Sequence, residues 1–218
     1  MRLFLASKGF GDHLERLHDM VGVNKMALLI FNATDEKNAL TRVWKKWRKK
    51  QMFKNAGFDV LELDLKVFFG RRYDLEMYIK SVNPGLIYAF GGNVFILRRA
   101  FRYSSFDDVL ASDLASDKYV YGGGSAGSVI MSKELKYFVN KEDMPEVVPK
   151  KKYQADTIWQ GMGLIDEYLL PHADAKWFDD SASEIRLAFN QANIKPVVMT
   201  DADVFVVDGE RRGLEPSA

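Results

Sequence analysis

The segment Lys118–Met131 reads KYVYGGGSAGSVIM and is the most informative part of the chain about its fold. Its first residues are aromatic or β-branched, which is typical of a buried strand, and its last residues are small or apolar and can form a helix. The glycines at 122–124 must therefore make the turn between the two. Gly123-x-Ser125-x-Gly127 is the nucleophile-elbow pattern, in which a strained strand-to-helix turn exposes the serine hydroxyl at the top of a sheet. A glycine-rich turn with a helix-capping serine is the other interpretation of the same five residues.

A second glycine turn precedes the first. The segment Leu86–Leu97 reads LIYAFGGNVFIL, which again predicts a strand, a turn at Gly91-Gly92 and the start of a helix. If the two strands are neighbours in a parallel sheet, both turns open on its carboxyl edge, where α/β proteins bind ligands. An N–H from this turn and the N–H of Ala126 would then form a two-donor oxyanion hole.

Length and composition narrow the function classes. With 218 residues, 47% of them hydrophobic, the chain can bury one sizeable core, so we expect a single α/β domain over residues 1–210 and a tail over residues 211–218. The absence of cysteine excludes disulfides, thiolate zinc sites and a cysteine nucleophile. A net charge of +1 gives no indication of a nucleic-acid or membrane partner.

Apolar runs are short throughout the chain. The run Leu3–Ala6 is too short for the apolar core of a signal peptide, and no segment approaches the length of a membrane span. A cytoplasmic protein is therefore expected.

Strand-like and helix-like segments alternate, which favours an α/β fold. The runs predicted as strands, besides the two before the glycine turns, are Leu3–Ala6, Met26–Phe31, Val60–Leu63, Pro196–Thr200 and Val204–Val207. The segments predicted as helices are Phe10–Val21, Ala39–Ala56, Tyr73–Val82 and Ala182–Gln191.

One predicted helix carries a run of positive charge. Residues 42–50 read RVWKKWRKK, and basic residues mixed with tryptophan are found in nucleic-acid-binding proteins. Four apolar residues nevertheless fall at helical spacing here: Leu40, Val43, Trp44 and Trp47. The tryptophans are therefore expected to form the buried stripe of the helix, with the lysines on its solvated back.

A serine nucleophile needs a base, and the chain has three histidines. His13 and His18 lie on an early predicted helix, whereas His172 follows the apolar run Leu169-Leu170-Pro171 and fits a base at the end of a strand. A capping or exposed loop histidine is the alternative for His172. The carboxylates between Ser125 and His172 that could orient it are Glu134, Glu142, Asp143, Glu146, Asp156 and Asp166.

Four motifs taken together resemble the serine peptidase family of dipeptidase E (aspartyl dipeptidase) and cyanophycinase. They are FGGNVF at 90–95, GGGSAGS at 122–128, DMP at 143–145 and LPH at 170–172. The similarity runs in the same order from about Leu3 to about Gly209, and the set is more specific than any single motif. The forms of the elbow and of the histidine segment are most similar to the uncharacterised bacterial branch.

The resemblance implies a fold and a set of catalytic residues. The fold is a three-layer α/β sandwich with a mostly parallel central sheet, related to class I glutamine amidotransferases, whose elbow cysteine this chain lacks. Ser125 is implied as the nucleophile and His172 as the general base. Asp143 of the DMP motif is implied as the third triad member, with Glu142 as the alternative because some relatives use glutamate.

The resemblance also bears on substrate binding. It implies the backbone of Gly92 and Ala126 as the oxyanion hole. Dipeptidase E has an arginine just before a Glu-x-Arg stretch that binds the aspartate side chain of its substrate, and here Ser183 occupies that position. A strong preference for an N-terminal aspartate is therefore not expected. Asn93 and Arg186 are the candidate substrate-binding residues.

Two function classes follow from the sequence. The first is a serine-type peptidase, of exopeptidase or dipeptidase type, that acts on short peptides with neither a cofactor nor a metal site. It would need no nucleic acid or membrane, and a homodimer is kept as an option for its assembly. The second is an inactive or non-peptidase relative that binds a ligand or hydrolyses an ester or amide at the same elbow.

Overall fold

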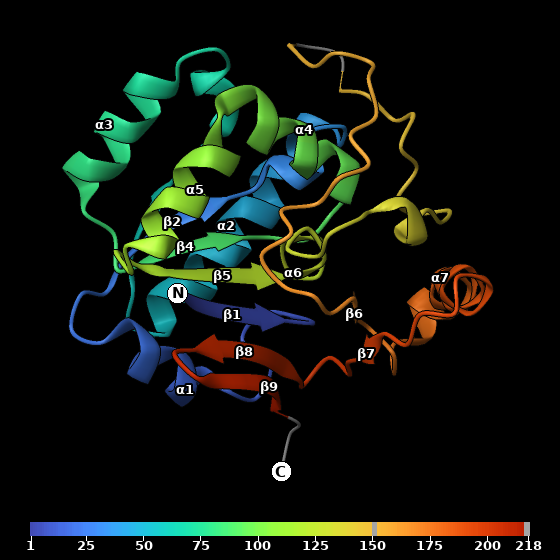
Figure 1. Ribbon diagram of the computed structural model, residues 1–218. Helices are drawn as coiled ribbons and strands as arrows, with labels where there is room; N and C mark the ends of the chain where they lie inside the picture. Colours follow the sequence, from blue (N-terminus) through green and yellow to red (C-terminus); the bar gives the residue numbers. More distant parts are fainter. Residues whose placement is uncertain (150–151, 216–218) are drawn as a thin grey trace.

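The computed structural model describes residues 1–149 and 152–215, and at its centre lies a seven-stranded sheet (Figure 1). The strand order is β3-β2-β4-β5-β1-β8-β9. These strands are β1 (Arg2–Ala6), β2 (Met26–Ile30), β3 (Asp59–Glu62), β4 (Leu86–Ala89), β5 (Val120–Gly124), β8 (Val204–Asp208) and β9 (Arg211–Glu215).

The sheet is parallel from β3 to β1 and becomes antiparallel at one edge. Strand β5 pairs in parallel with both β4 and β1, so the turns that follow β4 and β5 open on the same edge. Strands β8 and β9 continue the sheet antiparallel to β1 and to each other. This confirms the predicted mostly parallel α/β sheet and places the two glycine turns side by side.

Both faces of the sheet are covered by helices, which gives three layers. Along β1, Leu3 and Leu5 face one apolar core while Phe4 and Ala6 face the other, and all four are fully buried. Side chains alternate between the faces of a strand, so burial of both faces requires a continuous apolar run. This is the physical reason that the strands were recognisable in the sequence.

The helices divide unequally between the two faces. Buried residues of α1 (Leu14–Val21) and α2 (Ala39–Asn55) belong to the core that includes Phe4. The other core holds buried residues of α3 (Arg72–Val82), α4 (Val94–Ser104), α5 (Phe106–Ala115), α6 (Ala126–Val129) and α7 (Asp179–Gln191).

A two-stranded parallel sheet extends from the carboxyl edge of the main sheet. It consists of β6 (Leu169–Leu170) and β7 (Val197–Val198), with the α7 helix between them in the chain (Figure 1). The Met199 N–H continues the pairing by donating to the Leu170 carbonyl, and the Ala173 N–H donates to Met199 in return. The residues that follow β6 and β7 are therefore held next to each other.

The end of the chain differs from the predicted tail. Residues Arg211–Glu215 form β9, in register with β8 through pairs such as Val206 with Gly213. The charged sequence has little apolar character, but an edge strand needs only one paired neighbour and tolerates charge on its exposed side. Residues 216–218 of the predicted tail lie outside the described residues.

The predicted buried stripe of α2 is wrong. Trp44 and Trp47 are 55% and 59% exposed, whereas Phe53 near the end of the helix is fully buried. Phe53 packs against an aromatic cluster that includes Phe10, Tyr88 and Phe90. The helix thus touches the core mainly through its C-terminal part, and the tryptophans in its N-terminal part stay largely exposed.

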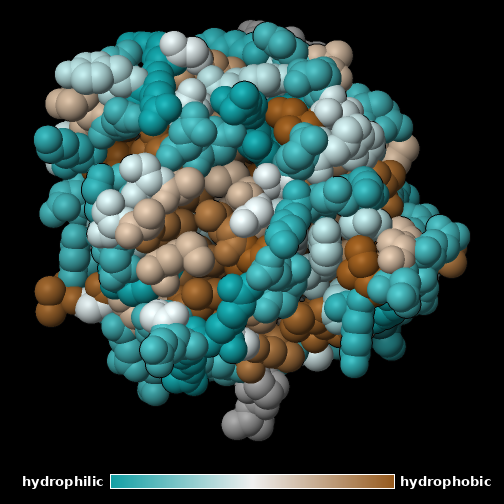
Figure 2. Space-filling view, in the orientation of Figure 1, coloured by the Kyte–Doolittle hydropathy of each residue, from teal (hydrophilic) through white to brown (hydrophobic). Residues whose placement is uncertain are grey.

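The surface is mixed in character. Figure 2 shows one face covered largely by hydrophilic side chains, with apolar side chains gathered in patches between them. No helix within the described part of the chain is both long enough and apolar enough to cross a membrane.

Phe53 and Trp47 of α2 should differ sharply in their contribution to the free energy of unfolding. We expect Phe53→Ala to lower the free energy of unfolding by about 3–5 kcal/mol, because it empties a site in a close-packed core. Trp47→Ala should change it by less than about 1 kcal/mol, because its ring is already exposed. Urea unfolding followed by circular dichroism measures both, and equal losses would show that the tryptophan side of α2 is covered in solution.

Candidate active site

Ser125 lies on a strained elbow between β5 and α6. Its backbone has φ 55° and ψ −114°, a conformation that L-residues other than glycine rarely adopt. Two hydrogen bonds to one carbonyl hold the turn: the Ser125 N–H donates to Ala6 O at 3.1 Å, and Ser128 Oγ donates to the same oxygen at 2.7 Å. The elbow predicted from the GGGSAGS motif is present in the structure.

Two glycines allow the elbow to pack against its neighbours. A Cβ at Gly127 would lie 2.1 Å from the Ala89 carbonyl oxygen, which excludes any side chain where α6 crosses the end of β4. A Cβ at Gly91 would lie 2.8 Å from the Cβ of Ser125. The turn after β4 therefore runs directly alongside the serine side chain.

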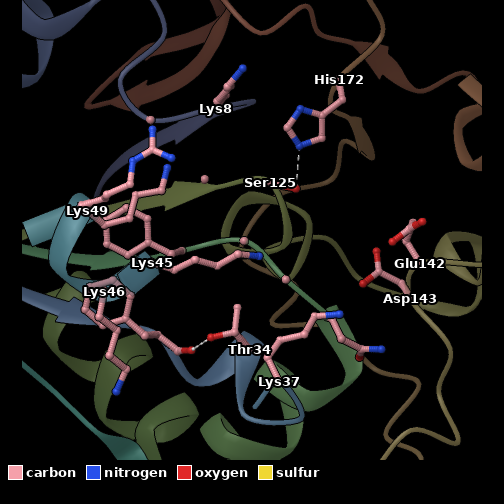
Figure 3. A pocket seen from close by; sticks show the side chains of 18 of the residues that line it. Lys8, Thr34, Lys37, Lys45, Lys46, Lys49, Ser125, Glu142, Asp143 and His172 are labelled. Carbon is pink, nitrogen blue, oxygen red and sulfur yellow. Dashed lines mark hydrogen bonds between the residues drawn. The ribbon is translucent and has the colours of Figure 1, made fainter. Parts of the chain in front are cut away.

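His172 reaches the serine from the end of β6. It also has a left-handed backbone, with φ 61°, and its N–H donates to Ser7 Oγ at 2.8 Å. This hydrogen bond ties the histidine backbone to the end of β1. The imidazole Nε2 lies 2.9 Å from Ser125 Oγ, and Figure 3 marks this contact. The imidazole and the serine hydroxyl are thus within hydrogen-bond distance, which is the geometry that a base and its nucleophile require.

A carboxylate that the sequence analysis did not consider, that of Asp201, completes the arrangement. The His172 Nδ1 lies 2.6 Å from Asp201 Oδ1. Lys8 Nζ contacts the other carboxylate oxygen at 2.8 Å. Burial opposes ionisation of this acid, but the hydrogen bonds from Lys8 and His172 hold the pKa of Asp201 below its usual value.

Burial lowers the pKa of His172 below its ordinary value of 6.5, although the hydrogen bond and the charge of Asp201 act in the opposite direction. The histidine is only 6% exposed, and the rings of Trp177 and Phe178 lie 4.9 and 5.4 Å from the imidazole. The imidazole is therefore kept neutral at neutral pH, as a general base must be.

Asp143 and Glu142, the acids predicted to orient His172, do not contact it. Asp143 Oδ1 instead accepts the N–H of Val94 at the start of α4 at 3.2 Å, and the Glu142 N–H donates to Asn140. Their loop is fixed at the α4 end of the site, so Asp201 occupies the position that we expected one of them to hold. Burial raises the pKa of Asp143 to about 7.

All the predicted acids lie between Ser125 and His172 in the chain, whereas Asp201 follows His172. A signal for Asp201 was nevertheless present. Asp201 directly follows the predicted strand Pro196–Thr200, and His172 follows another strand. Parallel pairing of β6 with β7 brings residues after both strands to one edge. No sequence pattern, however, indicated that these two short strands pair with each other.

The elbow opens into a cavity of about 640 Å³, a size suited to a small ligand. Helix α2 and the glycine turns form much of its wall, and aromatic rings line it as well. The cationic residues around it are Lys8, Lys37, Lys45, Lys46, Arg48 and Lys49, and the acidic ones are Glu36, Glu142 and Asp143. Figure 3 shows Glu142 and Asp143 on one side of Ser125, with the α2 lysines on the other.

The other predicted site residues have different fates. Gly92 and Asn93 line the cavity, but the Asn93 side chain caps α4 by accepting the N–H groups of Phe95 and Ile96. Ala126 is the first residue of α6, where the N–H has no acceptor within the helix. Arg186 is not among the described residues that line the cavity. No cluster of three or more potential metal ligands is found among the described residues.

A three-layer α/β fold with a serine, a histidine and a carboxylate in contact at a nucleophile elbow defines a class of hydrolytic enzymes. Within that class, the model of peptidase family S51 matches residues 4–212, so this chain belongs to peptidase family S51. The resemblance seen in the sequence motifs is thereby confirmed.

Individual relatives agree with this family. An uncharacterized peptidase from Listeria monocytogenes is 28% identical over 137 residues, which cover 62% of this chain and 61% of that relative. The crystal structure of a candidate peptidase E from Listeria monocytogenes EGD-e matches with a TM-score of 0.76 at 22% identity, over 100% of this chain and 98% of that one. A peptidase from an acI-B1 actinobacterium gives a TM-score of 0.65 at 18% identity, over 100% and 88% of the two chains. At these identities the two structures support the fold.

The assignment of Asp201 can be tested by titration. We expect the pKa of His172, followed by NMR of the imidazole, to lie below 6.5 because burial disfavours the charged ring. Asp201→Asn should lower it further, since the lost carboxylate raises the pKa in the native protein. Asp143→Asn is the matched control and should leave the titration unchanged. An equal shift in both variants would contradict the assignment.

Proposed function

We propose that this protein is a serine peptidase that cleaves short peptides through Ser125, His172 and Asp201. The observation that carries the proposal is the continuous contact from Asp201 through His172 to Ser125, with distances of 2.6 and 2.9 Å. Membership of peptidase family S51 supports the peptide bond as the bond that is cleaved.

The proposed reaction begins with attack by Ser125 Oγ on the carbonyl carbon of the substrate, while Nε2 of His172 accepts the serine proton. Asp201 fixes the imidazole with its proton on Nδ1 and stabilises the cation that forms. His172 then donates its proton to the leaving amine, which breaks the peptide bond and leaves an acyl group on Ser125. His172 then takes a proton from a water molecule, whose oxygen attacks the ester carbon. The bond from this carbon to Ser125 Oγ breaks, His172 returns the proton to Oγ, and the acid is released.

The negative charge on the carbonyl oxygen needs donors during both steps. In our proposal these donors are the backbone N–H groups of Gly92 and Ala126, on the two turns that meet at Ser125. Helix α6 has four residues, so its dipole contributes little, and the two N–H groups themselves carry the effect. This geometry suits acyl transfer in general, and the family selects peptides over other amides and esters.

The size and charge of the cavity favour short peptides. A volume of about 640 Å³ suits a drug-sized ligand rather than a folded chain. An inactive relative is not favoured, because all three triad groups are present and in contact. All the residues that line the cavity come from one chain, so the proposed reaction does not require the homodimer that is kept as an option for the assembly.

Loss of the serine should abolish activity without unfolding the protein. We expect Ser125→Ala to reduce kcat for short peptides at least about a thousandfold, because no covalent intermediate can form. Its thermal midpoint should stay within a few degrees of wild type, since the hydroxyl contributes little to the core. A fluorophosphonate probe should label the wild type and spare this variant. Wild-type rates in a protease-free preparation of Ser125→Ala would refute the proposal.

The two candidate acids should separate kinetically. Asp201→Asn should lower kcat by about a thousandfold or more, since the imidazole loses the partner that fixes its tautomer. Asp143→Asn should lower kcat by less than about tenfold, because an amide oxygen can still accept the Val94 N–H. Steady-state kinetics on one short peptide compares them. The reverse ranking would return the catalytic role to Asp143.

A further inference from the structure

We propose that Lys49, assisted by Lys45, binds the C-terminal carboxylate of the substrate, which makes α2 the element that selects short peptides. This inference rests on the proposed peptidase function and goes beyond it by assigning a residue to substrate choice. The cavity is surrounded by more cationic than acidic side chains.

Most cations around the cavity already have partners. Lys8 pairs with Asp201, Lys37 with Glu36, and Lys46 with Glu62. The Arg48 guanidinium lies 4.7 Å from the centre of the Trp44 ring. Among the described residues, Lys45 and Lys49 have no anionic partner, yet both line the cavity. An anionic ligand in the cavity would give Lys45 and Lys49 the charged partner that they lack.

Lys49 is the more constrained of the two. Its ammonium lies over the ring of Phe90, 5.4 Å from the centre. Burial lowers the pKa of Lys49, and the nearby positive charges of Arg48, Lys8 and Lys45 lower it further. The structure thus holds a positive charge at a place where both burial and the neighbouring cations disfavour it. A bound carboxylate would relieve both costs by giving the ammonium a charged hydrogen-bond partner.

The position of Lys49 indicates which carboxylate it binds. Figure 3 shows Lys49 and Lys8 on the same side of Ser125, and Lys8 pairs with Asp201, which contacts His172. His172 must protonate the leaving amine, so the leaving part of the substrate lies near this side. In a dipeptide the leaving residue carries the C-terminal carboxylate, about one residue length, roughly 3.5 Å, from the scissile nitrogen.

On the opposite side, Glu142 supplies the complementary charge. Figure 3 shows Glu142 across Ser125 from Lys45 and Lys49. A free dipeptide carries an ammonium at one end and a carboxylate at the other, and this charge pattern orients it with its carbonyl between them at Ser125. Because the order of charges fits the direction of cleavage, a C-terminal carboxylate fits this wall better than an acidic side chain on the acyl part of the substrate.

The test compares substrates with and without the carboxylate. Hydrolysis of Ala-Ala, Ala-Ala-amide and Asp-Ala-amide is followed by mass spectrometry for wild type, Lys49→Gln and Lys50→Gln. Lys50 is the matched control, because it is the next residue on α2, pairs with Glu62 at 2.8 Å and does not line the cavity. Unchanged turnover of the amide serves as an internal check that each variant is folded.

Wild type should prefer Ala-Ala over its amide by about 10- to 100-fold in kcat/KM, and Lys49→Gln should remove most of that preference. The amides should be cleaved within about threefold by all three proteins, and Lys50→Gln should behave as wild type. Equal cleavage of Ala-Ala and its amide by wild type would overturn the inference, as would an equal loss on both substrates in Lys49→Gln. Rescue of the amide by an N-terminal aspartate would assign the lysines to an acidic side chain instead and also overturn it.

Binding separates this inference from the proposed function. Calorimetry with Ser125→Ala should give tighter binding of Ala-Ala than of its amide, and Lys49→Gln in the same background should make the two equal. Absence of hydrolysis of every substrate by wild type would refute the peptidase function while this binding difference still tests the carboxylate site. Equal binding of the two ligands to Ser125→Ala would refute the site itself.

Discussion

The left-handed backbone conformation of Ser125 must be held in place by its neighbours before any other group of the site can be positioned. A residue with a Cβ at φ 55° costs on the order of 1–3 kcal/mol, and the structure must hold it there. The carbonyl of Ala6 does so by accepting two hydrogen bonds from the elbow. The elbow therefore requires that β1 and β5 be parallel neighbours, since only then does the end of β1 lie against the turn. The sheet order is in this sense part of the active site.

The end of β1 also connects the elbow to the other two groups. Ala6 holds the Ser125 turn, Ser7 Oγ accepts the His172 N–H, and Lys8 pairs with Asp201. Three consecutive residues thus position three groups that are distant in the chain. Residues at and just after the end of a central strand are well suited to this, because a strand paired on both sides has little freedom to move.

Asp201 and Asp143 are the same residue type, but their surroundings shift their pKa values in opposite directions. Asp201 receives hydrogen bonds from Lys8 and His172, which keep it ionised. Asp143 is half-buried on the other side of the site, and desolvation of its carboxyl raises its pKa to about 7, so much of it is protonated near neutral pH. A carboxylate that must stabilise an imidazolium has to stay charged, which suits Asp201 and not Asp143. The cations of α2 extend this division of charge across the cavity.

Features that belong to one segment of the chain could be predicted from the sequence. Continuous apolar runs revealed the strands because both faces of the sheet are buried, and glycine spacing revealed the elbow because only glycine permits its close approaches. His172 could be predicted because the chain has only three histidines and this one follows a predicted strand. These are properties of single segments, and each segment carries its own physical requirement in its composition.

Tertiary structure alone decided what depends on two distant segments meeting. Pairing of β6 with β7 brought Asp201 to His172, although each strand has two residues and no strong pattern. The exposure of Trp44 and Trp47 depended on which segments pack against α2, since helical spacing predicts a shared face but not what covers it. Residues 211–215 became a strand because β8 offered an open edge. Hydrophobic periodicity can be read from the sequence of one segment. Contact and burial depend on which two segments pack together, and the sequence of one segment alone does not specify its partner.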